Sequence, residues 1–193
     1  MLAHLLVPAL LVLAGCGGGD DADSAASAAP GTAPAPVPAP QTTAGTRATC
    51  DLPNFEAEAM ALVNAYRAAG ASCGSAGSFA AAPPLAWNAA LTQASLAHSD
   101  DMVTFNFVGH TGSNGSSAGD RATAAGYVWQ SWGENVAAGQ PTLAVVMAGW
   151  MASPGHCANI MRAGFRDIGL ACVKGGGGNT YRTYWTMMLG AAR

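Results

Sequence analysis

The chain has 193 residues, of which 50% are apolar and 10% are charged, whereas roughly 25% of residues are charged in an average soluble domain. Eight lysine and arginine residues stand against eleven acidic ones, which gives a formal net charge of −3. The sequence therefore offers no basic stripe for binding nucleic acid, and its length allows one ordinary domain with appendages.

The N-terminus carries an apolar run, Leu5–Leu13. It has the length of a signal-peptide core and is shorter than a membrane span, which takes about 20 residues. The run ends in Leu13-Ala14-Gly15-Cys16, which resembles a bacterial lipobox, so we expect residues 1–15 to be a lipoprotein signal peptide and Cys16 to be lipidated. The alternative is a plain signal peptide cleaved nearby. Gly17 after the cysteine favours the outer membrane in a Gram-negative cell. We therefore predict an extracytoplasmic, membrane-anchored protein.

Residues 16–49 are rich in Ala, Pro and Gly and contain no aromatic residue. Such a segment cannot bury enough apolar surface to offset the entropy that ordering costs, so we expect a disordered tether. Its Ala-Pro pairs favour an extended polyproline II conformation, which at about 3.1 Å per residue would hold the following domain some tens of ångströms from the membrane.

Residues 50–193 are predicted to form the folded domain, with helices first and strands concentrated near the end. Apolar residues at helical spacing predict a first helix from Phe55 to about Gly70. Further helices are expected from near Trp87 to Phe105, over roughly Ala118–Ala125, and after Pro141. Strands are expected at Tyr127–Val136, Ile168–Lys174 and Thr180–Leu189. This order of elements favours an α+β layered domain.

Four cysteines follow Cys16, namely Cys50, Cys73, Cys157 and Cys172. An even number in an exported chain indicates two disulfides, and four cysteines allow three pairings. We expect Cys50 to pair with Cys73 and Cys157 with Cys172, because each pair is local and closes a loop of plausible size. No Cys-x-x-Cys pair occurs in the sequence, which argues against a structural zinc knuckle.

Few residues in the domain carry reactive side chains. His98 lies on the apolar stripe of the second predicted helix, so we expect a buried, hydrogen-bonded core histidine. His110 lies in a glycine-rich loop, and loops on a rigid scaffold often carry function. Glu134 is an acid within an otherwise apolar strand and needs a partner if it is buried. His156 begins a predicted turn that also contains Asn159.

Several short segments occur in the order that is typical of one known family. They are Leu85-Ala86-Trp87-Asn88, Phe107–Gly112, Gly126-Tyr127, Gly133–Ala137, Gly149–Met161 and Tyr184-Trp185-Thr186. Together they resemble the CAP superfamily of cysteine-rich secretory, antigen 5 and pathogenesis-related-1 proteins, in its bacterial SCP-like branch. The resemblance implies a three-layer α-β-α sandwich. It also implies a cleft lined by two histidines and two acids, in which the histidines can hold a divalent metal.

The resemblance assigns His110 and His156 to the two cleft histidines and Glu134 to the acid of a Gly-Glu-Asn motif. Ser153 stands where many eukaryotic members have a second acid. We expect both Ser153 and Asn159 to line the cleft. Two interpretations remain open. His110, His156 and Glu134 bind zinc, more weakly than with a second carboxylate, or they form a hydrogen-bonded cluster that ties loops to the sheet.

We expect an exported, lipid-anchored protein that binds a small apolar ligand, a lipid or an envelope partner without catalysis, since one fold serves many roles. The alternative is a metal-assisted hydrolase, a protease or cell-wall enzyme, in which zinc on His110 and His156 activates water and Glu134 is the base. Gly115–Gly119 has a Gly-x-Ser-x-Gly pattern but follows a polar loop rather than a buried strand. We therefore assign no catalytic residue. A structural envelope protein is a third interpretation.

Overall fold

The computed structural model of the chain describes residues 47–193. The signal peptide, Cys16 and most of the tether lie outside these residues, so what we predicted for them stays a prediction. The folded domain begins slightly before the expected boundary at Cys50. Ala48 is buried, and Thr49 forms a parallel bridge with Cys172 in the sheet. The last residues assigned to the tether are therefore part of the domain.

The elements follow the predicted order, with short additions. The helices are α1 (Phe55–Ala69), α2 (Ala89–Phe105), α3 (Ala118–Ala124), α4 (Leu143–Ala152) and α5 (Pro154–Met161), with a 3₁₀ turn, η1 (Gly74–Ala76). The strands are β1 (Ala71–Ser72), β2 (Ser78–Phe79), β3 (Ala86–Trp87), β4 (Trp129–Ala138), β5 (Asp167–Lys174) and β6 (Thr183–Ala192). Helix α5 replaces the predicted turn around His156. Trp87 belongs to β3, because Asn88 caps α2 by accepting a hydrogen bond from the Leu91 amide.

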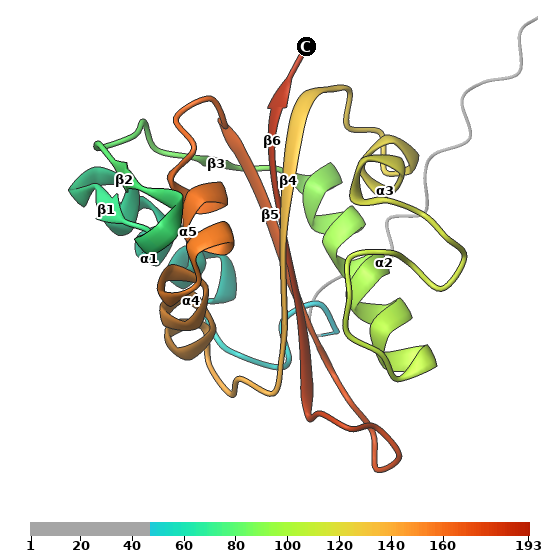
Figure 1. Cartoon of the computed structure of the whole chain (residues 1–193). Helices are drawn as coiled ribbons and strands as arrows, with labels where there is room; N and C mark the ends of the chain where they lie inside the picture. The colour runs from blue at the N-terminus through green and yellow to red at the C-terminus, as the bar shows by residue number, and fades with distance from the viewer. Residues whose placement is uncertain (1–46) are drawn as a thin grey trace, which may run out of the picture. The chain divides into compact units, whose positions relative to one another are not determined.

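A four-stranded sheet in the order β3-β5-β6-β4 forms the middle layer. Its long strands are antiparallel, and the short β3 runs parallel to β5. Helices α1, α4 and α5 lie on one side of the sheet, and α2 and α3 lie on the other (Figure 1). The three-layer α-β-α sandwich is therefore confirmed.

Helix α2 packs directly onto the sheet at a glycine. A Cβ atom at Gly169 would clash with the backbone of α2 at Leu91 and Thr92. The Ser95 hydroxyl donates to the Gly169 carbonyl at 3.0 Å, which fixes the register of the helix on β5. This contact positions the loop that follows α2, and that loop carries His110.

The larger apolar core lies between the sheet and the layer of α1, α4 and α5, and it includes Trp150, Trp185 and Phe165. Within this layer Arg67 of α1 is fully buried and lacks a carboxylate partner among the described residues. Its guanidinium donates instead to backbone carbonyls, among them Ile160 at 2.6 Å at the end of α5. Because the last carbonyls of a helix have no partner within it, Arg67 satisfies the end of α5 and holds that helix in place.

Two disulfides form, but the predicted local pairing is wrong. Cys50 is bonded to Cys172 of β5, with a Cα–Cα distance of 5.2 Å. Cys73, just before η1, is bonded to Cys157 of α5, with a Cα–Cα distance of 5.5 Å. Closeness along the chain misled the prediction, because the pairing of Thr49 with β5 and the packing of α5 on η1 bring distant cysteines together.

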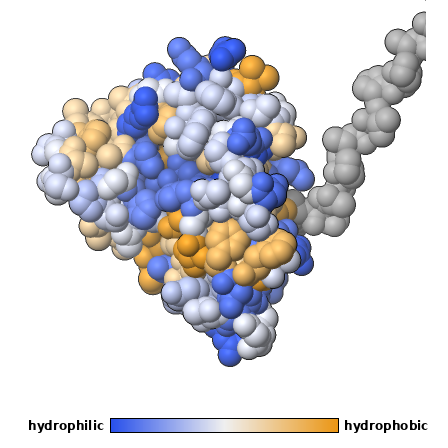
Figure 2. Space-filling view, turned by 45° about the vertical axis from the view of Figure 1, so that its right-hand side comes forward, coloured by the Kyte–Doolittle hydropathy of each residue, from blue (hydrophilic) through white to orange (hydrophobic). Residues whose placement is uncertain are grey.

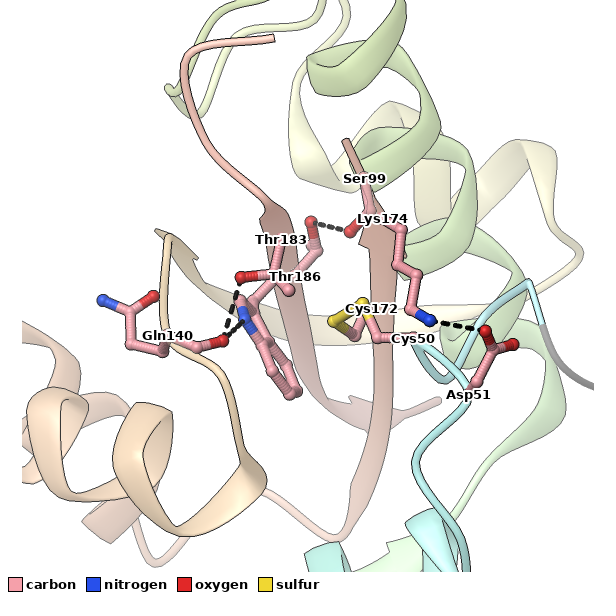
Figure 3. The surroundings of a disulfide bond; sticks show 9 residues. Cys50, Asp51, Ser99, Gln140, Cys172, Lys174, Thr183 and Thr186 are labelled. Atoms are coloured by element: carbon pink, nitrogen blue, oxygen red, sulfur yellow. Dashed lines mark hydrogen bonds and ion pairs between the residues drawn. A yellow bond between two sulfur atoms is a disulfide. The ribbon is translucent and has the colours of Figure 1, made fainter. Parts of the chain in front are cut away.

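Polar contacts surround the Cys50–Cys172 disulfide (Figure 3). Lys174 Nζ donates to Asp51 Oδ2 at 2.6 Å beside it. On the sheet, Ser99 of α2 donates to the Thr186 hydroxyl at 2.9 Å. The Gln140 carbonyl, between β4 and α4, accepts hydrogen bonds from Thr183 Oγ1 and Trp185 Nε1 at 2.9 Å each. These contacts tie the start of the domain, α2 and the β4–α4 loop to β5 and β6.

The surface of the domain is chemically mixed. On the face shown in Figure 2, hydrophilic residues form a band across the middle and hydrophobic residues gather below it. The large apolar side chains exposed to solvent are Phe105, Val108, Val128, Trp132, Val145 and Tyr181. Within residues 47–193, none of the helices combines the length and apolarity that crossing a bilayer requires.

Candidate functional site

Glu134 lies at the centre of the candidate site. It belongs to β4, and its side chain is 2% exposed. Oε1 accepts a hydrogen bond from His110 Nδ1 at 2.8 Å, and Oε2 accepts one from Arg121 Nη2 at 2.6 Å. The buried carboxylate thus has the partner that its position in an apolar strand required, and both of its oxygens are engaged.

Arg121 of α3 was not expected at the site from the sequence. It is 8% exposed, and besides Glu134 it donates to the Ser116 carbonyl at 2.9 Å and the His110 carbonyl at 3.0 Å. A capping box at Ser117 and Asp120 fixes where α3 begins. That Ser-x-x-Asp pattern, together with the need of a buried acid for a counter-charge, is the signal that could have identified Arg121.

His98 supports the His110 loop from beneath. It is fully buried on α2, as predicted, and its Nε2 donates to the Gly109 carbonyl at 2.7 Å. Its Nδ1 has no hydrogen-bond partner in the described part of the chain. Burial is the main cause that lowers the pKa of His98, so the ring is neutral near pH 7. A neutral His98 therefore anchors the residue that precedes His110.

Helix α5 brings the second histidine and Asn159 to the same strand. Asn159 Nδ2 donates to the Glu134 carbonyl at 3.1 Å and to Asn135 Oδ1 at 3.0 Å. Asn135 Nδ2 donates in turn to the His156 carbonyl at 3.1 Å. These bonds join α5 to the outer edge of β4. Ser153 lies between α4 and α5, where its side chain caps neither helix.

The pKa values of His110 and His156 are shifted in opposite directions from the ordinary value of a histidine. The hydrogen bond to Glu134 is the main cause that raises the pKa of His110 above its ordinary value. Burial lowers the pKa of His156, and the nearby His110 lowers it further. Of the two rings, His156 is therefore the one that stays neutral to lower pH.

These elements enclose a cleft of about 360 Å³, within the size range of small-molecule sites. The residues that line it are His110, Thr111, Ser117, Ala118, Trp132, Gly133, Glu134 and Asn159. Of the predicted cleft residues, Asn159 lines this volume, whereas Ser153 and His156 lie outside its lining. A larger hollow of about 820 Å³ lies beside the start of α1, but no histidine lines it. The candidate functional side chains His110 and Glu134 therefore line the smaller cleft.

In this arrangement the Glu134 carboxylate holds Nδ1 of His110 and leaves Nε2 available to a ligand. With Nδ1 of His110 bound to Glu134, its Nε2 has no partner among the described residues and its side chain is 59% exposed. A carboxylate in this position is the usual second partner of a metal-binding histidine. Within residues 47–193, no three His, Cys, Asp or Glu side chains already form a ligand set. Zinc binding by His110, His156 and Glu134 stays a prediction.

Comparison with known proteins identifies relatives of the domain. Residues 60–189 match the CAP model, described as the cysteine-rich secretory protein family. Over 93 residues, 48% of this chain, the sequence is 34% identical to the uncharacterized protein YkwD of Bacillus subtilis (strain 168) and covers 36% of that protein.

Two solved structures are similar to the domain. One is an extracellular protein containing an SCP domain from Bacillus anthracis str. Ames, with a TM-score of 0.50 and 27% identity over 56% of this chain and 34% of that chain. The other is an outer surface protein from Borrelia burgdorferi, with a TM-score of 0.52 and 17% identity over 58% of this chain and 80% of that one. The second likeness supports the fold alone. The chain spans about a third of the length of YkwD and of the Bacillus anthracis protein.

Proposed function

The chain belongs to the CAP family of cysteine-rich secretory proteins, and from that premise we propose that it is an extracytoplasmic binding protein that acts without catalysis. Its binding site is the cleft at His110, Trp132 and Asn159. Two disulfides support a location outside the cytoplasm, because disulfides persist in oxidising compartments. A solved relative is described as extracellular, in agreement with this location.

The engagement of Glu134 is the observation that carries the proposal. A general base needs a lone pair within reach of the proton that it removes. Both Glu134 oxygens already accept charge-assisted hydrogen bonds, from Arg121 and His110, and the side chain is almost fully buried. With Ser153 in place of a second acid, the cleft lining holds no other carboxylate. These features favour binding over the hydrolase alternative.

Zinc is a candidate ligand of this cleft. His110 Nε2 and His156 would hold the ion, with Glu134 behind His110 rather than in contact with the metal. Zinc there would act as a Lewis acid or as a link to a bound partner. The expected affinity is lower than that of a three-ligand protein site, because the proposal gives the ion only two side-chain ligands.

We also propose that Cys16 is lipidated and that the segment after it places the domain in the cell envelope. Replacing Cys16 with Ser is expected to release the protein from membranes, and fractionation measures this. Unchanged membrane association in the variant would contradict the lipid anchor.

Of the ligand classes that the sequence left open, the polar groups of His110, Thr111 and Asn159 favour an envelope partner over a wholly apolar molecule or a lipid.

Co-sedimentation of the purified full chain with peptidoglycan sacculi, and separately with phospholipid vesicles, tests the proposed function. We expect sedimentation with the sacculi that depends on the cleft, no cleft-dependent sedimentation with the vesicles, and no released soluble fragments detected by mass spectrometry. His110→Ala is expected to reduce sedimentation, while Glu58→Gln, an exposed change on α1, leaves it unchanged. Steady release of soluble fragments that stops in Glu134→Gln would contradict the proposal and support the hydrolase.

A further inference from the structure

Trp132 contributes a partly exposed aromatic ring, the Trp132 shelf, to the lining of the cleft. It is 36% exposed on β4 and lines the same volume as His110 and Asn159. Its indole lies against α3 at Gly119, where an added Cβ would be 2.5 Å from the ring nitrogen. On another side Trp129 meets it edge-on, with ring centroids 6.5 Å apart at 86°. The ring is therefore held in place before any ligand arrives.

Trp129 is itself anchored, because its indole N–H donates to the Thr123 hydroxyl of α3 at 3.0 Å. A rigid aromatic side chain loses little conformational entropy when a ligand covers it. Both supports of Trp132 come from α3 or are tied to it, so the shelf and the Arg121–Glu134 ion pair share one helix.

Polar groups without partners share the cleft lining with Trp132. His110, Thr111 and Asn159 line the volume, and within the described residues His110 Nε2, Thr111 Oγ1 and Asn159 Oδ1 have no hydrogen-bond partner. Together they can accept hydrogen bonds and, through the Thr111 hydroxyl, donate one. An apolar ligand would leave all three unsatisfied, which is costly where water is displaced.

With His110 neutral, the charge of the cleft is balanced. Glu134 is neutralised by Arg121 at 2.6 Å, and the guanidinium also donates to two backbone carbonyls. Neither group is free to bind an anionic or a cationic ligand. The site therefore favours a neutral molecule with one flat C–H face and several hydroxyls, since aromatic faces attract C–H edges and the polar atoms take the hydroxyls.

We propose that the cleft binds a neutral pyranose sugar of an envelope glycan, with one sugar face on Trp132 and its hydroxyls on His110, Thr111 and Asn159. This inference rests on the proposed function, because it names the ligand class of the same cleft. The volume of about 360 Å³ suits a small ligand or the end of a chain rather than a broad protein interface.

Calorimetry of the purified full chain with chitotriose, cellotriose and maltotriose tests the sugar site. At least one of them is expected to bind, and Trp132→Ala is expected to weaken that binding about tenfold or more. Trp132→Phe, which keeps an aromatic face, should retain part of it. Gly119→Ala should also weaken binding, because it displaces the indole without changing a polar atom of the cleft.

Val128→Ala is the matched control, because Val128 is 68% exposed beside the same strand and outside the cleft lining. It should leave affinity unchanged, and thermal melts confirm that each variant is folded. No heat with any of the three sugars, or equal affinity in wild type and Trp132→Ala, would overturn the sugar inference. If sedimentation with sacculi depends on His110 but not on Trp132, the proposed function holds and the sugar inference is wrong. Sedimentation that is lost when the sacculi are first treated with protease would identify a protein partner instead and also overturn it.

Discussion

Glu134→Gln removes the charge at the centre of the site while keeping the shape of the side chain. The change leaves the Arg121 guanidinium, 8% exposed, without its carboxylate partner. Because a Gln amide has one acceptor oxygen where Glu134 has two, it can accept a hydrogen bond from Arg121 or from His110 but not from both. Breaking a buried ion pair from one side costs about 3 to 5 kcal/mol. Arg121 keeps its bonds to the Ser116 and His110 carbonyls, so we expect the lower end, about 3 kcal/mol.

Denaturant unfolding followed by tryptophan fluorescence measures this loss, and thermal melts should show a fall in Tm of about 6 to 12 °C. A double-mutant cycle with Arg121→Met separates the pair from other effects of each change. NMR titration adds an independent readout, since the pKa of His110 should fall in Glu134→Gln once the hydrogen bond that raises it is weakened. A coupling energy below about 0.5 kcal/mol between Glu134 and Arg121, together with an unchanged His110 titration, would refute the reasoning.

The Cys50–Cys172 disulfide, the buried His98 and the proposed zinc site each allow a further test. Cys50→Ser with Cys172→Ser opens a link across 122 positions of sequence and should cost about 5 kcal/mol by chemical denaturation; a loss below about 1 kcal/mol would contradict this. The folded pKa of His98 is lowered, so the unfolded state takes up the proton first and stability should fall as pH drops through about 6.5. Glu134, Arg121 and Asp101 act on the same ring, and His98→Gln should flatten the curve of stability against pH. Zinc titrated by calorimetry should bind more tightly to Ser153→Glu than to wild type, and no heat in either would leave the two histidines without a metal role.

Local patterns predicted those helices and strands in which the spacing of apolar residues within the segment shows which side is buried. The apolar stripe from Phe55 predicted α1 correctly, and the apolar runs of β5 and β6 were expected within a few residues of where they lie. Helix α5 was missed because it is eight residues long and begins with Pro154 and Gly155. Its stability comes from Arg67, from a disulfide and from packing on α4, which no local pattern reveals.

The candidate site divides in the same way. The family resemblance assigned His110, His156 and Glu134 to one cleft, and the structure places His110 and Glu134 in its lining but His156 outside it. Arg121 and Trp132 were not assigned from the sequence. The capping box at Ser117 and Asp120 is an indirect signal for Arg121, whereas no local pattern marks Trp132. Their roles depend on how α3 lies against β4, which is a tertiary contact.

Binding without catalysis is the central claim, and amide chemical-shift mapping of the purified full chain with soluble peptidoglycan fragments tests it most directly. The account predicts that shifts concentrate around His110, Trp132 and Asn159, and that the fragments are recovered chemically unchanged by mass spectrometry. Shifts confined to another surface of the domain, or fragments that are cleaved during the titration, would contradict it.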